Sequence, residues 1–264
     1  MYALSLMKSL PNVVLGNVLM NYVDLADISR LDSASCNCKE RLSLLKIIYS
    51  GCITYTENGL EELLKQSCNY SYRNSCSLFI NWLIHRNVSV NFLVLGSMAS
   101  VDRTMLKDYL TEMGHRIKTV SSVCGHQKLL KEICEYCPNV ELISVTPISR
   151  SADCRMAIAA WPNIKQIELN TAVTDEMLET IGLSCKQLVD FKSSNMMKLT
   201  AAGWLRFVNI CNPCLLSIDL NDVSISAEHI EIIAYRLKML RKFTRLLTDD
   251  WLIALVQGCH SLEE

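Results

Sequence analysis

The sequence has no excess of charge of either sign. Its 264 residues carry 26 lysines and arginines against 27 aspartates and glutamates, so the formal net charge at pH 7 is −1. A chain that binds nucleic acid, anionic lipid or a polyanionic substrate through its overall field needs a clear excess of positive charge. We therefore expect neither a nucleic acid nor a membrane among its partners.

Long apolar runs are also missing. Polar residues or proline interrupt each apolar stretch well before the ~20 residues that a membrane-spanning helix needs. Lys8 and Pro11 interrupt the apolar N-terminus, which lacks the basic leader of a secretory signal. We expect a cytoplasmic or nuclear protein, in which the 13 cysteines are reduced and mostly buried, because free cysteine packs like a small apolar residue.

What the sequence does contain is a repeat. An apolar pattern of the form LxxLxL recurs in steps of about 22 to 27 residues, within the range of short β/α repeats. The first apolar residues of the copies are Val90, Ile117, Val140, Ile164, Leu188, Leu215 and Leu240, and Leu262 opens a fragment. The second copy is the weakest, because Ser122 stands where an aliphatic residue is expected.

A second signal follows the same rhythm. A serine or threonine precedes a stretch with helical apolar spacing after most copies, and these hydroxyls are good N-caps. The predicted caps are Ser100, Ser151, Thr174, Thr200, Ser226 and Thr248. One such unit cannot bury its own apolar face, so the copies are expected to stack into a parallel sheet covered by a layer of helices.

This pattern resembles the cysteine-containing leucine-rich repeats over residues 88–264. Cys137, Cys185 and Cys259 lie three residues before the first aliphatic position, and Thr174-Asp175 matches the opening of a helix. Trp161 and Asn212 replace the cysteine in two copies. The resemblance implies an α/β fold, a right-handed β/α leucine-rich-repeat solenoid of about seven repeats. The last residues stop inside the strand of an eighth copy, so the chain is either a fragment or leaves that strand as an edge.

Residues 8–48 are expected to form a small helical segment before the solenoid. Its order of Leu10-Pro11, aliphatic pairs at Val14 and Val18, and Tyr22-Val23-Asp24-Leu25 resembles an F-box, although the usual late tryptophan is absent. The resemblance implies that Leu10, Pro11, Val14, Val18 and Leu25 contact a Skp-type adaptor of a cullin–RING ubiquitin ligase. Residues 49–87 are expected to form a helical, irregular join with an opening repeat.

The repeat also predicts which residues face away from the helices, on what we call the concave face of the sheet. The candidate partner-binding residues there are Phe92, Val94, Leu142, Gln166, Glu168, Asp190, Lys192, Asp219 and Lys242. The same register adds Thr119, Ser121, Ser144, Ser217 and Thr244. This surface runs from apolar to mixed charge, which suits a protein or peptide partner.

Motifs of catalysis are missing. The chain has no GxxxxGK[ST], GxGxxG or HExxH, and its five histidines show no metal-ligand spacing. Cys134–Cys137 and Cys211–Cys214 have the spacing of zinc-ligand pairs, but the repeat would place them about three repeats apart. We therefore expect no metal, no cofactor and no catalytic residue.

Three hypotheses for function follow. The first is a substrate receptor of the F-box/leucine-rich-repeat type, which holds a substrate on the concave face for ubiquitylation. The second is a scaffold or adaptor for protein–protein interaction, with no ubiquitin-ligase role and with the N-terminal helices acting as a cap. The third is an enzyme with a nucleophilic cysteine, which requires one thiol with a lowered pKa.

Overall fold

The computed structural model describes residues 25–34, 41–42, 45, 82, 84–86, 90–94, 102–123, 127–145, 151–194, 198–220, 233, 235–244, 253, 255, 258–259 and 261–263. The chain folds as two compact units, residues 1–117 and residues 118–264. The boundaries predicted from the sequence, after residues 48 and 87, stay predictions.

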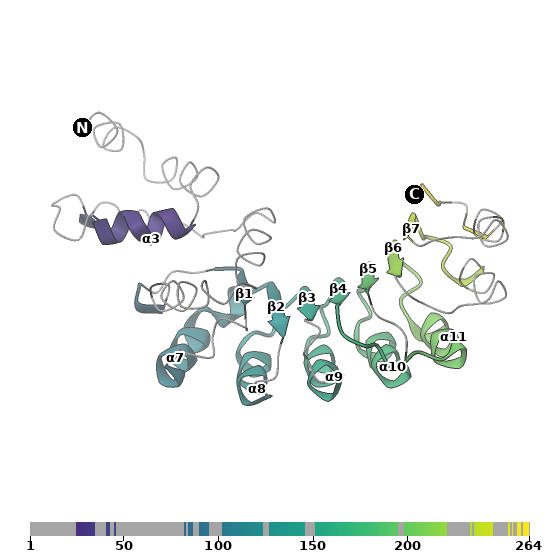
Figure 1. Cartoon of the computed structure of the whole chain (residues 1–264), viewed down its shortest axis with the longest axis horizontal. Coiled ribbons are helices and arrows are strands. Elements are labelled where there is room, and N and C mark those ends of the chain that lie inside the picture. The colour runs from purple at the N-terminus through teal and green to yellow at the C-terminus, as the bar shows by residue number, and fades with distance from the viewer. Residues whose placement is uncertain are drawn as a thin grey trace. The chain divides into compact units, whose positions relative to one another are not determined.

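The second unit alternates strands with helices and confirms the predicted β/α leucine-rich-repeat fold. Its elements, in chain order, are β2 (Thr119–Val123), α8 (Gln127–Tyr136), β3 (Leu142–Val145), α9 (Ser151–Ala160), β4 (Gln166–Leu169), α10 (Asp175–Ser184), β5 (Asp190–Ser193), α11 (Ala201–Ile210), β6 (Ser217–Leu220) and β7 (Lys242–Thr244). The strands lie in this order in a parallel sheet, with helices α8 to α11 on one side of it (Figure 1).

The register of the sheet places one apolar residue of each strand in line with the next. These residues are Val120, Ile143, Ile167, Phe191, Ile218 and Phe243, all at most 4% exposed. The ring of Phe191 lies 5.5 Å from that of Phe207 in α11, so this side of the sheet packs on the helices. Burying such side chains stabilises the fold by about 1.5–3 kcal/mol each.

Two of the predicted helix caps are confirmed. The hydroxyl of Thr174 accepts from the amide of Met177 at 3.4 Å, and that of Thr200 accepts from Gly203 at 3.0 Å. The prediction for the helix after residue 100 is wrong, because Asp102 and not Ser100 caps it. Its carboxylate accepts from two free amides of the first turn, those of Thr104 and Met105.

The position that cysteine occupies in several of the repeats is buried. Cys137, Cys185 and Cys259 are at most 2% exposed, and Trp161 fills the same position with 0% exposure. Asn212 uses its side-chain amide to donate to the carbonyl of Leu188, in the preceding repeat, at 3.1 Å. The position therefore tolerates several residue types, provided that the side chain fills the space between repeats or bonds across it.

The weak second copy is explained by a bulge in β2. Thr119 and Val120 pair with Leu142 and Ile143, but the next pairing joins Val123 to Val145. A bulge inserts extra residues on one strand and shifts the register beyond it. Val123 thereby takes the strand position that the sequence pattern assigned to Ser122. Ser121 lies within this bulge and is 1% exposed, so the prediction that it lies on the concave face is wrong.

The first unit contains α3 (Leu25–Ala34), β1 (Phe92–Val94), α7 (Arg103–Met113) and the short 3-10 helix η2 (Gly114–Arg116). Helix α3 carries Ile28, which is 1% exposed. Helix α7 buries Leu106, Tyr109 and Leu110 on one face.

Asp175 joins two neighbouring repeats of the second unit. It is the first residue of α10, but its carboxylate accepts from the amide of Thr200 at 2.8 Å and from the hydroxyl of Thr200 at 2.6 Å. Arg206 adds an ion pair at 3.4 Å. A methyl group on Gly203 would overlap the carboxylate of Asp175. Because Gly203 has no side chain, the carboxylate of Asp175 has room to bond to Thr200 at the start of α11.

We expect Gly203→Ala to lower the free energy of unfolding by about 2 kcal/mol, because it displaces a charged hydrogen-bond acceptor. Elsewhere in a helix the same change stabilises by about 0.5–1 kcal/mol. In an Asp175→Ala background the methyl group has room, so the added Gly203→Ala should be neutral or stabilising. Urea unfolding of the four proteins checks this. Equal destabilisation in both backgrounds would contradict the explanation.

Candidate functional site

The concave face of the second unit carries two rows of exposed and partly exposed side chains. The first row, in strand register, consists of Thr119, Leu142, Gln166, Asp190, Ser217 and Lys242. The second row consists of Ser144, Glu168, Lys192, Asp219 and Thr244. Neighbouring members lie on adjacent strands, which in a sheet are about 5 Å apart. The structure therefore brings seven of the nine predicted binding residues onto one surface.

Phe92 is not part of that surface. It lies in β1 of the first unit and is 6% exposed, so the prediction that it faces a partner is wrong. The pattern marked Phe92 as outward by position alone, but exposing an aromatic ring is unfavourable and the fold covers it. The side chain of Val94, on the same strand, lies outside the described residues.

Charged residues gather on the central strands of the concave face. Glu168 and Lys192, on β4 and β5, form an ion pair at 3.8 Å and are 41% and 50% exposed. Asp190 and Asp219 lie on β5 and β6, partly exposed. One carboxylate oxygen of Asp219 is buried and has no hydrogen-bond partner in the described structure. This arrangement offers fixed charges and acceptors to a molecule placed over the sheet.

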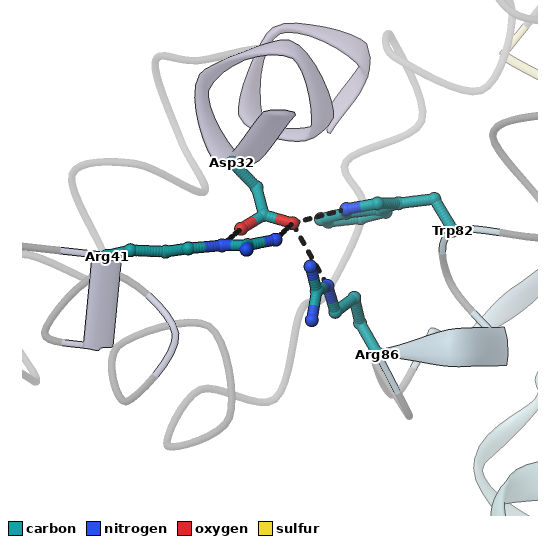
Figure 2. Close-up of polar contacts among 4 residues, drawn as sticks. All are labelled: Asp32, Arg41, Trp82 and Arg86. Carbon is teal, nitrogen blue, oxygen red and sulfur yellow. Dashed lines mark hydrogen bonds and ion pairs between the residues drawn. The ribbon is translucent and has the colours of Figure 1, made fainter. Parts of the chain in front are cut away.

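A second polar cluster lies inside the first unit and was missed by the sequence analysis. Asp32 of α3 is 1% exposed, and its carboxylate accepts from Arg41 at 2.9 Å, from Arg86 at 3.0 Å and from the indole of Trp82 at 2.9 Å. Figure 2 shows the two arginines and the tryptophan converging on this carboxylate. The partners are 9, 50 and 54 residues away in the chain, so no local motif reveals the cluster.

Burial alone would raise the pKa of Asp32. The hydrogen bonds from Arg41 and Trp82 and the charges of Arg86 and Arg41 outweigh it and hold the pKa of this carboxyl below its ordinary value. The carboxylate thus stays charged and fully paired, which is the condition for burying an ion without a large penalty. The cluster therefore serves as a structural link between α3 and the side chains of Arg41, Trp82 and Arg86.

Five of the seven described cysteines are buried, Cys134 is half-buried and Cys214 is exposed. Burial raises the pKa of Cys134, Cys137 and Cys185 to about 12 and that of Cys211 to about 11. Such thiols are almost entirely protonated at neutral pH and are poor nucleophiles. Within the described ranges, no three His, Cys, Asp or Glu side chains come close enough to hold a metal ion.

No helix in the part of the chain that the structure describes is both long and apolar enough to span a membrane.

Comparison with known proteins gives one family. The family model described as "Poxvirus A51 protein" matches residues 45–232. No curated protein matches the sequence. A chain of the crystal structure of the Rad7 and Elc1 complex in yeast is similar at 18% identity, with a TM-score of 0.47, over 58% of this chain and 43% of that chain. The tropomodulin C-terminal domain of Caenorhabditis elegans is similar at 16% identity, with a TM-score of 0.41, over 53% of this chain and 93% of that domain.

The predicted membership of the F-box/leucine-rich-repeat family is therefore wrong, and so is the predicted role as a ubiquitin-ligase substrate receptor. Aliphatic pairs at helical spacing occur in any amphipathic helix, so they do not identify an F-box. The adaptor-binding role of Leu10, Pro11, Val14, Val18 and Leu25 depended on that resemblance alone. Four of these residues lie outside the described residues, and Leu25 is the first residue of α3.

We expect Asp32→Asn to lower the free energy of unfolding by about 3 kcal/mol, because it leaves Arg41 and Arg86, which are 25% and 27% exposed, without the buried counter-charge that they share. Asp27→Asn, on the same helix, is the matched control. Asp27 pairs with Arg30 at the surface, with 57% and 78% exposure, and such pairs contribute at most about 1 kcal/mol. Urea unfolding followed by circular dichroism measures both. Similar losses for the two variants would contradict the assigned role of Asp32.

The same cluster should make stability depend on pH. The pKa of Asp32 is lowered in the folded protein, so its contribution is complete above the unfolded value of ~4 and is lost as the pH falls towards the folded value. The difference in unfolding free energy between wild type and Asp32→Asn should be largest at neutral pH and shrink below pH ~4. A difference that stays constant between neutral and acid pH would contradict this assignment.

Proposed function

The chain belongs to the poxvirus A51 protein family, and we propose that it is a non-enzymatic interaction protein that binds a partner protein on the concave face of its sheet. The observation that carries this proposal is the alignment of accessible side chains in two rows, the first across strands β2 to β7 and the second across β3 to β7. A repeat sheet of this kind offers an extended surface with regularly spaced side chains, which suits a protein partner better than a small molecule.

The composition of this surface supports the proposal. It combines an apolar residue, Leu142, with amide, hydroxyl and charged groups further along the sheet. Protein interfaces of the non-obligate kind have this mixed character, with a few anchors and matched polar groups. The solenoid would act by holding its partner, so no reacting group is needed on the surface.

Among the described cysteines, the buried thiols favour this proposal over the enzymatic hypothesis. A nucleophilic cysteine needs a lowered pKa, whereas burial raises the pKa of Cys134, Cys137 and Cys185 to about 12. The described cysteines are free thiols, which supports the further proposal of a cytoplasmic or nuclear location.

The Asp32 cluster supports a structural role for α3. The ion pairs of Asp32 with Arg41 and Arg86 fix this helix to residues of the same unit. Removing one partner of such a buried pair is strongly unfavourable. We propose that α3 is part of the folded body of residues 1–117 and serves as its cap, not as a detachable docking helix.

Exchanging the charges of one ion pair tests the proposed surface. The variant Glu168→Lys/Lys192→Glu keeps the net charge and the pairing on the concave face but reverses the pattern that a partner meets. The control Arg155→Glu/Glu176→Arg makes the same exchange in the ion pair between helices α9 and α10. Tagged proteins are expressed in poxvirus-infected cells, cross-linked and purified, and the bound proteins are quantified by mass spectrometry.

We expect at least one bound protein to fall about tenfold with the concave-face exchange and to stay at the wild-type level with the helix exchange, since misplaced interface charges cost several kcal/mol. Thermal unfolding confirms that both variants fold. If wild type and both variants retain the same proteins in the same amounts, the concave face is not the binding surface.

A further inference from the structure

A third row of side chains lies where the strands begin, next to the first row of the concave face. Each member donates its amide to the carbonyl of the member before it, at 2.7–2.9 Å. In order from the start of the unit, the members are Lys118, Glu141, Lys165, Val189, Leu216, Arg241 and Glu263. Neighbouring side chains of this row come into contact, because Glu141 forms ion pairs with Lys118 at 2.6 Å and with Lys165 at 2.7 Å.

A fourth row lies two residues earlier, in the turns that join each helix to the next strand. Its members are Asn139, Asn163, Gln187, Cys214, Met239 and Ser261. The side chains of this row also reach one another, since the amide of Gln187 donates to Asn163 at 3.3 Å. The third and fourth rows together line the edge of the solenoid at which the strands start.

Both rows change from polar to apolar along the solenoid. The third row is charged as far as Lys165, and the fourth row carries amides as far as Gln187. The apolar residues that follow are Val189, Leu216, Cys214 and Met239, which we call the rim patch. Met239 is 46% exposed, Cys214 is exposed, and the other two are half-buried. The polar residues at the same positions in earlier repeats show that the fold does not need apolar side chains here.

Positive charge borders the rim patch on the helix side. The turns that carry the patch are residues 185–189, 211–216 and 237–241, and their charged residues are Lys186, Lys238 and Arg241. Lys186 donates to the carbonyls of Gly182 at 2.7 Å and Ile210 at 3.3 Å, at the ends of two neighbouring helices. These carbonyls hold the ammonium group in place but bring no negative charge to neutralise it.

Lys238 repeats this arrangement in the next turn. Its ammonium group donates to the carbonyl of Gly258 at 3.3 Å. Arg241 differs, because it forms an ion pair with Glu263 at 3.7 Å. On the concave side the first row continues with Asp190 and Lys242, whose charges are opposite. The positive side of the patch is therefore the helix side, at Lys186 and Lys238.

Apolar side chains that gather in one exposed place indicate a binding surface more often than scattered ones do. The two rows of the concave face contain one aliphatic residue, Leu142, whereas a protein interface usually has an apolar centre with polar groups around it. The rim patch directly precedes the first row along the chain and supplies such a centre. Carboxylates are the partner groups that match the ammonium groups beside it.

We propose that the partner protein docks an acidic segment with aliphatic side chains on the rim patch. Its aliphatic side chains pack on Leu216 and Met239, and its carboxylates accept from Lys186 and Lys238. This inference rests on the proposed function, because it gives the partner of the concave face its apolar anchor. A basic segment would meet like charges at the same place, so the patch selects by charge as well as by shape.

The test measures binding of short, capped, dye-labelled peptides to the full chain by fluorescence anisotropy at low salt. The three probes alternate leucine with glutamate, leucine with lysine, and serine with glutamate. The variant Leu216→Gln/Met239→Asn makes the patch polar, and Leu183→Gln/Ile253→Gln is its control. The control residues are 58% and 55% exposed aliphatic side chains that lie on helices.

A second pair of variants tests the charges. Lys186→Gln/Lys238→Gln removes the ammonium groups beside the patch. Its control Lys128→Gln/Lys131→Gln removes two exposed lysines from α8, so both variants change the net charge equally. Thermal unfolding shows that all four variants fold, and sedimentation equilibrium gives the oligomeric state of each.

The leucine–glutamate peptide should bind wild type and both controls alike, and bind the patch variant and the Lys186/Lys238 variant about tenfold more weakly, as expected when anchor contacts are lost. The other two peptides should bind wild type at least about tenfold more weakly than the leucine–glutamate peptide. Equal affinity of that peptide for wild type and the patch variant overturns the inference. A wild-type dimer that the patch variant loses assigns the patch to a second copy of this chain and also overturns it.

The two proposals can fail separately. If the variant Glu168→Lys/Lys192→Glu loses a bound protein in infected cells while Leu216→Gln/Met239→Asn retains it and binds the peptides as wild type does, the concave face is the interface and the rim patch is not. If the variant Glu168→Lys/Lys192→Glu loses no bound protein, the proposed function fails, whatever the peptides do.

Discussion

The parallel register of the sheet in residues 118–264 is the constraint on which the rest of that unit depends. Side chains alternate between the two faces of a strand, so a shift of one residue would send every apolar side chain to solvent. Val120, Ile143, Ile167, Phe191, Ile218 and Phe243 hold the register because each must lie between the sheet and the helices. The same constraint fixes the opposite face, where the candidate binding residues lie.

Polar contacts join neighbouring repeats in addition to the apolar core. Asp175 bonds to Thr200 of the next repeat, and Asn212 bonds to the carbonyl of Leu188 in the preceding one. Each satisfies a backbone group that would otherwise lack a partner near a helix or strand end. Stability in a stacked fold depends on such contacts between neighbours, because one repeat buries too little surface alone.

The proposed role as an interaction protein rests on the open face of this sheet. Its side chains are spaced regularly by the strands, in two rows. Charged side chains of both signs lie on this face, Glu168, Asp190 and Asp219 being acidic and Lys192 and Lys242 basic, in a chain that is nearly neutral as a whole. Electrostatic selectivity can therefore arise on this face without the strong overall field that would attract nucleic acid.

The sequence by itself determined the repeat and the concave positions from Leu142 to Lys242, because both follow from the apolar periodicity. It also determined the order of strands and helices, since Thr174 and Thr200 are residue types that cap helices. It did not determine the family, since the same periodicity serves unrelated proteins. The bulge that buries Ser121, the covering of Phe92 and the pairing of Asp32 with Arg86 were decided by tertiary structure alone. Arg86 lies 54 residues from Asp32 in the chain, and the bulge arises only where β2 pairs with β3, so no local pattern encodes either contact.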